Sequence, residues 1–331
     1  MKILIAFILI FFSSIVNQNT YSSKYYARNY IVLDYHSQEV LEGKNYHQSY
    51  SVASISKIMT AIIALESDRL FDVIVVDDII FEVEGASIYL QEGDQITILD
   101  LVYGLLLRSG NDAAMLIANN VCDSVDEFVD LMNQKKEMLQ LENTIFHNPS
   151  GLDISDEGNI SSCFDMAKLM SYCLNNELFC QIINTKSYYS PLKGNWINKN
   201  KLLHNYEYCI GGKTGYTKKA RRTLITVSEK DYQKLIIVTF DSPNDFSFHK
   251  DRYEFYFNNY RYLVFLVKGK NYIDEYYIFS EKLVGLRIDK NILKGTKVYY
   301  INPINNSLKI KFISLEKTYE IDEEFPIIYH K

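Results

Sequence analysis

The sequence has no long cluster of basic residues, and its formal charge is −6. Both features argue against a nucleic-acid partner, because a phosphate-binding surface needs a concentration of Lys and Arg. Zinc-ligand spacing of Cys and His is also missing, and the six histidines are scattered along the chain. We therefore expect neither a metal site nor another cofactor.

The cysteines do not form a complete set of pairs. Their number, five, leaves at least one thiol unpaired. Cys173 and Cys180 lie on what the pattern indicates is one helix face, too far apart along its axis for a disulfide. We expect most of the thiols to be small buried apolar groups. The five are Cys122, Cys163, Cys173, Cys180 and Cys209.

The chain does have enough apolar sequence for a large core. Hydrophobic residues make up 47% and aromatic residues 14% of its 331 residues, so a long disordered stretch is not expected. Lys2 precedes an apolar run from Ile3 to Phe12, which is short for a membrane span and suits an export signal. Residues 1–22 are therefore interpreted as a signal peptide or an N-terminal membrane anchor.

The first candidate motif is Ser54-Ile55-Ser56-Lys57, which opens a segment with apolar residues at helical spacing. Ser54 at a helix start would lie near unpaired backbone N–H groups, where a developing oxyanion is favoured. Lys57 would share that face and, as a neutral amine, would take the serine proton. Its pKa must then be depressed, by burial and by a second cation, for which Lys213 is the candidate. Alone, the motif also fits an N-cap and an ordinary helix.

The second candidate motif, Ser109-Gly110-Asn111, interrupts an apolar helix with a polar turn. Such a turn can direct two side chains into a cleft. Ser109 would pass a proton to a leaving amine, and the Asn111 amide would hold both Lys57 and the substrate backbone. A plain connection between two helices is the alternative interpretation.

The third candidate motif, Lys213-Thr214-Gly215, lies in a glycine-rich segment that permits a ligand backbone to approach an edge strand. Lys213 and Thr214 would bind a substrate carboxylate. The N–H of Tyr216 would join that of Ser54 in an oxyanion hole. A hairpin with one exposed lysine is the alternative for this motif alone.

The three motifs together are far more specific than any one of them. Penicillin-binding proteins and class A β-lactamases carry such a set in this order, and the chain resembles a D-alanyl-D-alanine carboxypeptidase of the low-molecular-mass penicillin-binding protein family. The resemblance covers most of residues 27–265. Its further segments are Ala27–Asp34, Glu84–Leu90, Phe146–Asp153 and Asp165–Met170.

Two positions depart from the family pattern. Asn159 stands where the family frequently has histidine, and Arg221 stands where a glycine is expected after Ala220. Neither change removes a predicted catalytic group. Both bear on substrate preference and efficiency.

The resemblance implies an α/β fold of the β-lactamase and penicillin-binding-protein type, with an antiparallel sheet and a helical subdomain. We expect the catalytic domain over 23–248 and a small all-β domain over 249–331. The family often ends in an amphipathic membrane helix, but Phe325–Lys331 lacks that pattern. Any membrane association is therefore expected through the N-terminus, and the protein is expected to be exported, as a secreted or membrane-associated protein at the cell wall.

The reaction implied by the resemblance is removal of the terminal D-alanine from peptidoglycan stem peptides through an acyl-enzyme on Ser54. β-Lactams would acylate the same serine. A DD-transpeptidase using this acyl-enzyme, or a catalytically silent wall-binding protein, are the alternatives. A class A β-lactamase is disfavoured because its E-x-x-L-N string is absent. The catalytic set is Ser54, Lys57, Ser109, Asn111 and Lys213, and the substrate-binding set is Lys213, Thr214, Gly215 and Tyr216.

Strand and helix patterns place these motifs in the fold. They predict an opening hairpin over 30–34 and 39–41, a helical region over 54–184 with an extended insert near 73–88, and an antiparallel pair over 223–227 and 235–240. The turn of that pair is expected at Glu229–Asp231. The third motif would lie on a strand beside the pair, at the cleft between sheet and helices. In the last domain, Asn305-Asn306 predicts a hairpin turn.

Overall fold

The computed structural model describes residues 25–153, 158–273, 276–290, 297–304, 307–313, 318–323 and 327–329. The signal peptide or anchor predicted over 1–22 and the turn predicted at Asn305-Asn306 lie outside these residues. Among the helices that are described, none is long and apolar enough to cross a bilayer.

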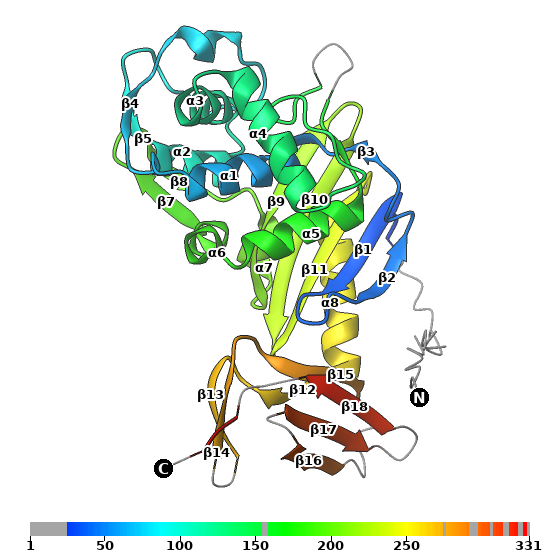
Figure 1. Ribbon diagram of the computed structural model, residues 1–331. Coiled ribbons are helices and arrows are strands. Elements are labelled where there is room, and N and C mark those ends of the chain that lie inside the picture. The colour runs from blue at the N-terminus through cyan, green and yellow to red at the C-terminus, as the bar shows by residue number, and fades with distance from the viewer. Residues whose placement is uncertain are drawn as a thin grey trace, which may run out of the picture.

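A five-stranded antiparallel sheet, ordered β2-β1-β11-β10-β9, forms the centre of the main domain (Figure 1). Ile236 and Val238 enter the core on one face, and Leu235 and Ile237 enter the core on the other, as the two-residue period of a strand requires. The predicted hairpin, antiparallel pair and edge position of the third motif are confirmed. The strands are β1 (Asn29–Asp34), β2 (Val40–Lys44), β9 (Cys209–Thr217), β10 (Arg221–Lys230) and β11 (Gln233–Phe240).

The turn between β10 and β11 lies later than predicted. Lys230 pairs with Gln233, so Asp231 and Tyr232 form the turn, and both have positive φ angles. Two such residues are typical of the type I′ turn, whose twist matches that of the strands. The placement at Glu229–Asp231 is wrong because the ladder continues through Lys230.

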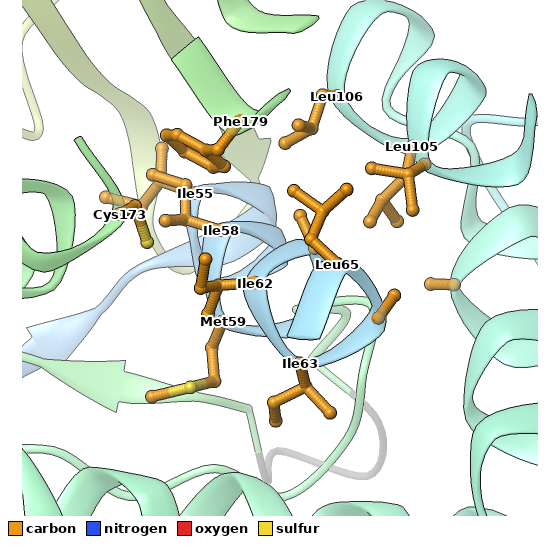
Figure 2. Close-up of a cluster of buried hydrophobic side chains, with 14 of the residues drawn as sticks. Ile55, Ile58, Met59, Ile62, Ile63, Leu65, Leu105, Leu106, Cys173 and Phe179 are labelled. Carbon is orange, nitrogen blue, oxygen red and sulfur yellow. The ribbon is translucent and has the colours of Figure 1, made fainter. Parts of the chain in front are cut away.

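Helices cover one face of the sheet and surround the segment that carries the first motif. Nearly all of α1 is buried, and Figure 2 shows Ile58, Met59 and Ile62 packed among apolar side chains from other helices. Because core truncations cost roughly 2–5 kcal/mol each, this packing holds α1 rigidly. The helices here are α1 (Lys57–Glu66), α2 (Ile98–Tyr103), α3 (Asn111–Val121), α4 (Val125–Met138), α5 (Cys163–Cys173) and α6 (Glu177–Asn184).

Short elements connect these helices. The expected extended insert is only partly extended, because a 3-10 turn follows β4. Cys173 ends α5 whereas Cys180 lies in α6, so their placement on one helix face is wrong; all five thiols are free, and three are buried. The short elements are β3 (Tyr50–Ser51), η1 (Ala53–Ser56), β4 (Val73–Val75), η2 (Asp78–Glu82), β5 (Gln95–Thr97), the π-helical turn η3 (Gly104–Arg108), β6 (Ile160–Ser161), β7 (Ser187–Ser190) and β8 (Gly194–Ile197).

The opposite face of the sheet is covered by α7 (Lys201–Asn205) and α8 (Asp245–Asn259) (Figure 1). Tyr253 of α8 is fully buried and donates a hydrogen bond to the carbonyl of Thr226 in β10 at 2.8 Å. The domain boundary predicted between residues 248 and 249 therefore falls inside a helix that packs on the catalytic sheet. We propose that the second domain begins after α8 instead, because buried residues run along this helix from Phe248 to Phe257.

The chain beyond α8 forms only strands among its described residues, which confirms a small all-β domain. β12 pairs with β15, while β13-β14-β19 and β16-β17-β18 form two further sheets (Figure 1). The strands are β12 (Tyr260–Leu266), β13 (Gly269–Ile273), β14 (Tyr276–Ser280), β15 (Val284–Asp289), β16 (Lys297–Ile304), β17 (Ser307–Ile313), β18 (Thr318–Glu323) and β19 (Ile327–Tyr329).

Arg221 has a backbone conformation that suits the glycine it replaces. Its φ is 59°, in the left-handed region. We expect Arg221→Gly to raise the free energy of unfolding by about 0.5–1 kcal/mol, because relief of backbone strain exceeds the added entropy of the unfolded chain. Urea denaturation of the two proteins measures this difference in the free energy of unfolding. Arg221→Lys, which keeps a β-carbon, is the control, and an equal gain from it would locate the effect in the side chain instead.

Candidate active site

Ser54 lies in the short 3-10 turn η1, one turn before α1 begins at Lys57. Ala53, the residue before it, is buried and has a φ of 51°. Such a conformation is uncommon for alanine and persists only where the surroundings impose it. The sheet contributes to these surroundings, because the Thr223 hydroxyl of β10 donates a hydrogen bond to the carbonyl of Val52 at 2.9 Å. The serine therefore sits on a backbone turn that the sheet holds in place.

Lys57 is fully buried and has three partners. Its Nζ lies 3.0 Å from Ser54 Oγ and 2.7 Å from Asn111 Oδ1, and it also donates to the carbonyl of Ser150. Two of these oxygens can only accept, whereas the serine hydroxyl can also donate. A neutral amine would therefore give its two N–H groups to Asn111 and Ser150 and keep its lone pair for the Ser54 proton.

Burial, and to a smaller extent Lys199, together lower the pKa of Lys57 to about 7, although Asp112 acts in the opposite direction. Much of the lysine is then neutral near neutral pH, as the predicted role requires. Lys199 is one cation that acts on Lys57, and the predicted partner Lys213 is coupled to Lys57 as well, since two nearby ammonium groups lower each other's pKa. Lys199 follows β8, and its backbone N–H donates to the carbonyl of Leu107 at 3.0 Å, next to the Ser109 turn.

The second motif joins this cluster through both of its polar residues. Ser109 follows η3 with a φ of 66°, and α3 then begins at Asn111, so the predicted break between two helices is confirmed. The Asn111 amide accepts from Lys57 through Oδ1, while its Nδ2 donates to the carbonyl of Glu84 at 2.7 Å. One of its two N–H groups is thus used within the protein.

The third motif meets the second on the edge strand β9. Lys213 is buried, and its Nζ donates to Ser109 Oγ at 2.8 Å and to the carbonyl of Thr214 at 2.7 Å. Burial holds its pKa well below the usual value, and Lys57 and Lys199 act in the same direction. The two lysines of the motifs therefore bracket Ser54 and Ser109, each in contact with one hydroxyl.

β9 also runs close beside the turn that carries Ser54. A β-carbon added to Gly215 would lie 3.1 Å from the backbone nitrogen of Ser54 and 2.4 Å from the Thr223 hydroxyl. Only glycine lets the strand approach the turn so closely. Tyr216, the next residue, is 61% exposed. The use of its N–H as a second oxyanion donor stays a prediction.

The segment Phe146–Asp153 also contacts the site, and it does so through backbone groups, which a sequence does not reveal. Besides the Ser150 carbonyl, Gly151 packs against the turn at Ala53, and the Thr60 hydroxyl donates to the carbonyl of Pro149 at 2.7 Å. The sequence indicated that this segment matters, but not that its carbonyls position the lysine.

Asn159, the departure from the family's histidine, is fully buried and fully bonded. Its Oδ1 accepts from the backbone N–H groups of His147 and Asn148, and its Nδ2 donates to Ser56 Oγ and to the carbonyl of Asn148. The asparagine thus connects the segment Phe146–Asp153 to the turn that carries Ser54. In the part of the chain that the structure describes, no group of His, Cys, Asp and Glu could hold a metal ion.

Comparison with known proteins agrees with this geometry. A family model described as D-alanyl-D-alanine carboxypeptidase, Peptidase S11, matches residues 16–244. The D-alanyl-D-alanine carboxypeptidase DacF of Bacillus subtilis is 31% identical over 223 residues, which are 65% of this chain and 57% of DacF. The chain spans 73% of DacB2 of Mycobacterium tuberculosis and 55% of DacA of Escherichia coli, so it matches only part of these relatives.

Solved structures extend the likeness. A D-alanyl-D-alanine carboxypeptidase from Mycobacterium tuberculosis is 29% identical with a TM-score of 0.67, over 72% of this chain and 95% of that chain. Penicillin binding protein 5 from Haemophilus influenzae covers 92% of this chain and 98% of its own with a TM-score of 0.76, and at 22% identity it shows the fold alone. Its coverage includes the small β domain. The family model alone matches well over half of the sequence, and the chain therefore belongs to the D-alanyl-D-alanine carboxypeptidase family of serine peptidases.

Proposed function

We propose that this protein is a serine-type D-Ala-D-Ala carboxypeptidase that trims the terminal D-alanine from peptidoglycan stem peptides. The observation that carries the proposal is the placement of Lys57. Its buried Nζ has two neighbours that can only accept hydrogen bonds and a third, the Ser54 hydroxyl, that can donate one. A buried lysine whose pKa is near 7 beside a serine has the properties of a general base.

In the proposed reaction, Ser54 Oγ forms a bond with the carbonyl carbon of the penultimate D-alanine while its proton passes to Lys57. The tetrahedral oxyanion is stabilised by the N–H groups of Ser54 and Tyr216. The bond to the terminal D-alanine nitrogen then breaks, and that nitrogen receives a proton from Ser109. Ser109 is resupplied through Lys213 with the proton that Lys57 took from Ser54, so Lys57 is neutral again. Water, activated through Lys57, hydrolyses the acyl-enzyme and restores the serine.

The remaining groups hold the substrate. Lys213 and Thr214 bind the terminal carboxylate, and the free N–H of the Asn111 amide binds the peptide backbone. Gly215 lets β9 run beside the substrate, because any larger residue would press against the Ser54 nitrogen. A β-lactam presents the same carbonyl and carboxylate, so it is expected to acylate Ser54 and to be released slowly.

The family acts on the bacterial cell wall, and we infer that the protein works outside the cytoplasm. Export would use residues 1–22, either as a cleaved signal peptide or as a retained membrane anchor. Mass spectrometry of the protein recovered from its cells distinguishes a start near residue 23 from an intact N-terminus.

The test is intact-mass analysis of the purified protein after incubation with benzylpenicillin, with Ser54→Ala as the matched variant. We expect a stable adduct of one drug molecule on the wild type and none on Ser54→Ala, because Ser54 is the proposed nucleophile and Lys57 is its base. An adduct that persists on Ser54→Ala would overturn the assignment. Rapid loss of the drug without an adduct would indicate a β-lactamase, and neither loss nor adduct would indicate a silent binding protein.

A second assay separates hydrolysis from transfer. Water and an amine can both accept the acyl group, so a carboxypeptidase supplied with two peptides is expected to release D-alanine with little crosslinked product. Crosslinked peptide as the main product would make the protein a DD-transpeptidase instead.

A further inference from the structure

Asp112, the residue that follows the second motif, is a buried carboxylate in the first turn of α3. Its two oxygens accept hydrogen bonds from neutral groups, three of which belong to residues 84–90. The donors are the Ser87 hydroxyl at 2.5 Å and the backbone N–H groups of Ile88 at 3.1 Å, Leu90 at 3.4 Å and Ala113 at 2.9 Å. The carboxylate therefore ties this segment to the start of the helix.

Asn111 binds the same segment from the neighbouring position. Its backbone N–H donates to the carbonyl of Ala86 at 2.6 Å, and its Nδ2 donates to the carbonyl of Glu84 at 2.7 Å. Because Nδ2 is directed at the Glu84 carbonyl, Oδ1 of the same amide is directed at Lys57. The orientation of the Asn111 amide thus depends on where residues 84–90 lie, and Asp112 helps to place them.

The backbone of the second motif packs directly against this arrangement. A β-carbon added to Gly110 would lie 2.8 Å from Asp112 Oδ1 and 3.1 Å from Cγ2 of Ile88. The carboxylate and the segment that it holds are therefore in close contact with the motif. A shift of either one would move the backbone between Ser109 and Asn111.

Asp112 also contributes a negative charge to a group of cations. Lys199, which follows β8, lowers the pKa of Lys57, whereas Asp112 raises it. Lys213 on β9 is coupled to Lys57, and Arg108 of η3 lowers the pKa of Lys199 in turn. An opposite charge favours the protonated form of an amine, so loss of the Asp112 charge would make Lys57 a weaker base.

We propose that Asp112 is a positioning residue for acylation, which keeps the Asn111 amide aligned with Lys57 through residues 84–90 and partly offsets the surrounding cations. This inference rests on the proposed function, since the step that it concerns is the acylation of Ser54. Asp112 takes no part in bond making, because its oxygens are occupied by donors from the protein.

The test is the pH profile of acylation by benzylpenicillin in Asp112→Asn, which keeps the shape of the side chain and removes its charge. In the wild type, the rate is expected to rise about tenfold between pH 6 and pH 8. In Asp112→Asn, Lys57 loses its proton at lower pH, so this rise is expected to shrink to about threefold or less. The rate at pH 8 is expected to fall by about tenfold or more, because the base is weaker and the Asn111 amide is displaced.

Asp165→Asn is the matched control for a purely structural effect. Asp165 is also buried in the first turn of a helix, α5, and accepts from the N–H of Asn143 at 2.7 Å and the Thr144 hydroxyl at 2.8 Å. It is not among the charges that act on Lys57. We expect this variant to lose stability and to keep the rise of about tenfold.

Ser87→Ala tests the anchoring of residues 84–90 with the charge in place, and it replaces Asp112→Asn if that variant does not fold. It is expected to slow acylation at pH 8 by about threefold or more and to keep the full rise with pH. An unchanged rate in Ser87→Ala, or an unchanged rise in Asp112→Asn, would overturn the positioning role. An equal change in Asp165→Asn would do the same. A wild type that forms no adduct would instead refute the proposed function itself.

Discussion

Replacing Lys57 with Met is expected to slow acylation of Ser54 by benzylpenicillin by about 10³-fold. A positioned general base contributes roughly 10²- to 10⁴-fold, and Lys57 is the basic side chain in contact with the Ser54 hydroxyl. Stopped-flow measurement of adduct formation gives the rate. Lys135→Met, in which the lysine removed lies on α4, is the matched control and is expected to retain the wild-type rate.

The pH dependence tests whether Lys57 acts as a neutral amine. Its pKa is about 7, so protonation below that pH removes the lone pair that accepts the serine proton. The acylation rate is expected to rise about tenfold between pH 6 and pH 8, as the neutral fraction does. Lys57→Arg keeps the positive charge but cannot be deprotonated, and it is expected to be as slow as Lys57→Met. A flat profile, or activity in Lys57→Arg, would contradict the general-base role.

The second large effect is expected at Gly151, which packs against the turn that carries Ser54. Its φ is 78°, and an added β-carbon would lie 2.2 Å from the Ala53 carbonyl oxygen and 2.5 Å from Ser56 Oγ. Neither atom belongs to a long side chain that could move away. We expect Gly151→Ala to lower the free energy of unfolding by roughly 2–5 kcal/mol, from left-handed strain together with overpacking, and to slow acylation.

Gly93→Ala is the matched control for this substitution. Gly93 has a similar φ of 85°, but nothing lies within 4 Å of an added β-carbon. It should show the left-handed strain alone, about 1–2 kcal/mol, with acylation unchanged. Urea denaturation of both variants measures the difference, and equal losses would mean that the contact with Ala53 does not constrain the turn.

Local patterns in the sequence indicated most of the elements that matter. The helical spacing after Ser54, the break at Ser109-Gly110-Asn111 and the strand pair before and after residue 231 were all readable, because each depends on residues near one another in the chain. The predictions that differ from the structure concern features that are set by tertiary contacts. Cys180 belongs to a separate helix, and α8 belongs to the catalytic sheet, because packing rather than composition sets those boundaries.

In the candidate site, too, some features were predicted from local sequence and others were found only in the structure. Its reactive side chains are polar residues in short motifs, and the sequence marks them. Lys199, the carbonyl of Ser150 and the connection through Asn159 were missed, because each is brought to Lys57 or to the Ser54 turn by folding. The role of a backbone carbonyl in particular cannot be predicted from residue type, because every residue has one.

By itself, then, the sequence determined the fold class, the three motifs and the family resemblance, since these follow from residue type and spacing. The tertiary structure alone decided the pKa of Lys57, because that value depends on burial by distant segments and on a cation from the segment after β8. It also decided that Ser54 lies on a strained turn held by Thr223 and Gly151. Reactivity is a property of the assembled surroundings, and only folding brings those surroundings together.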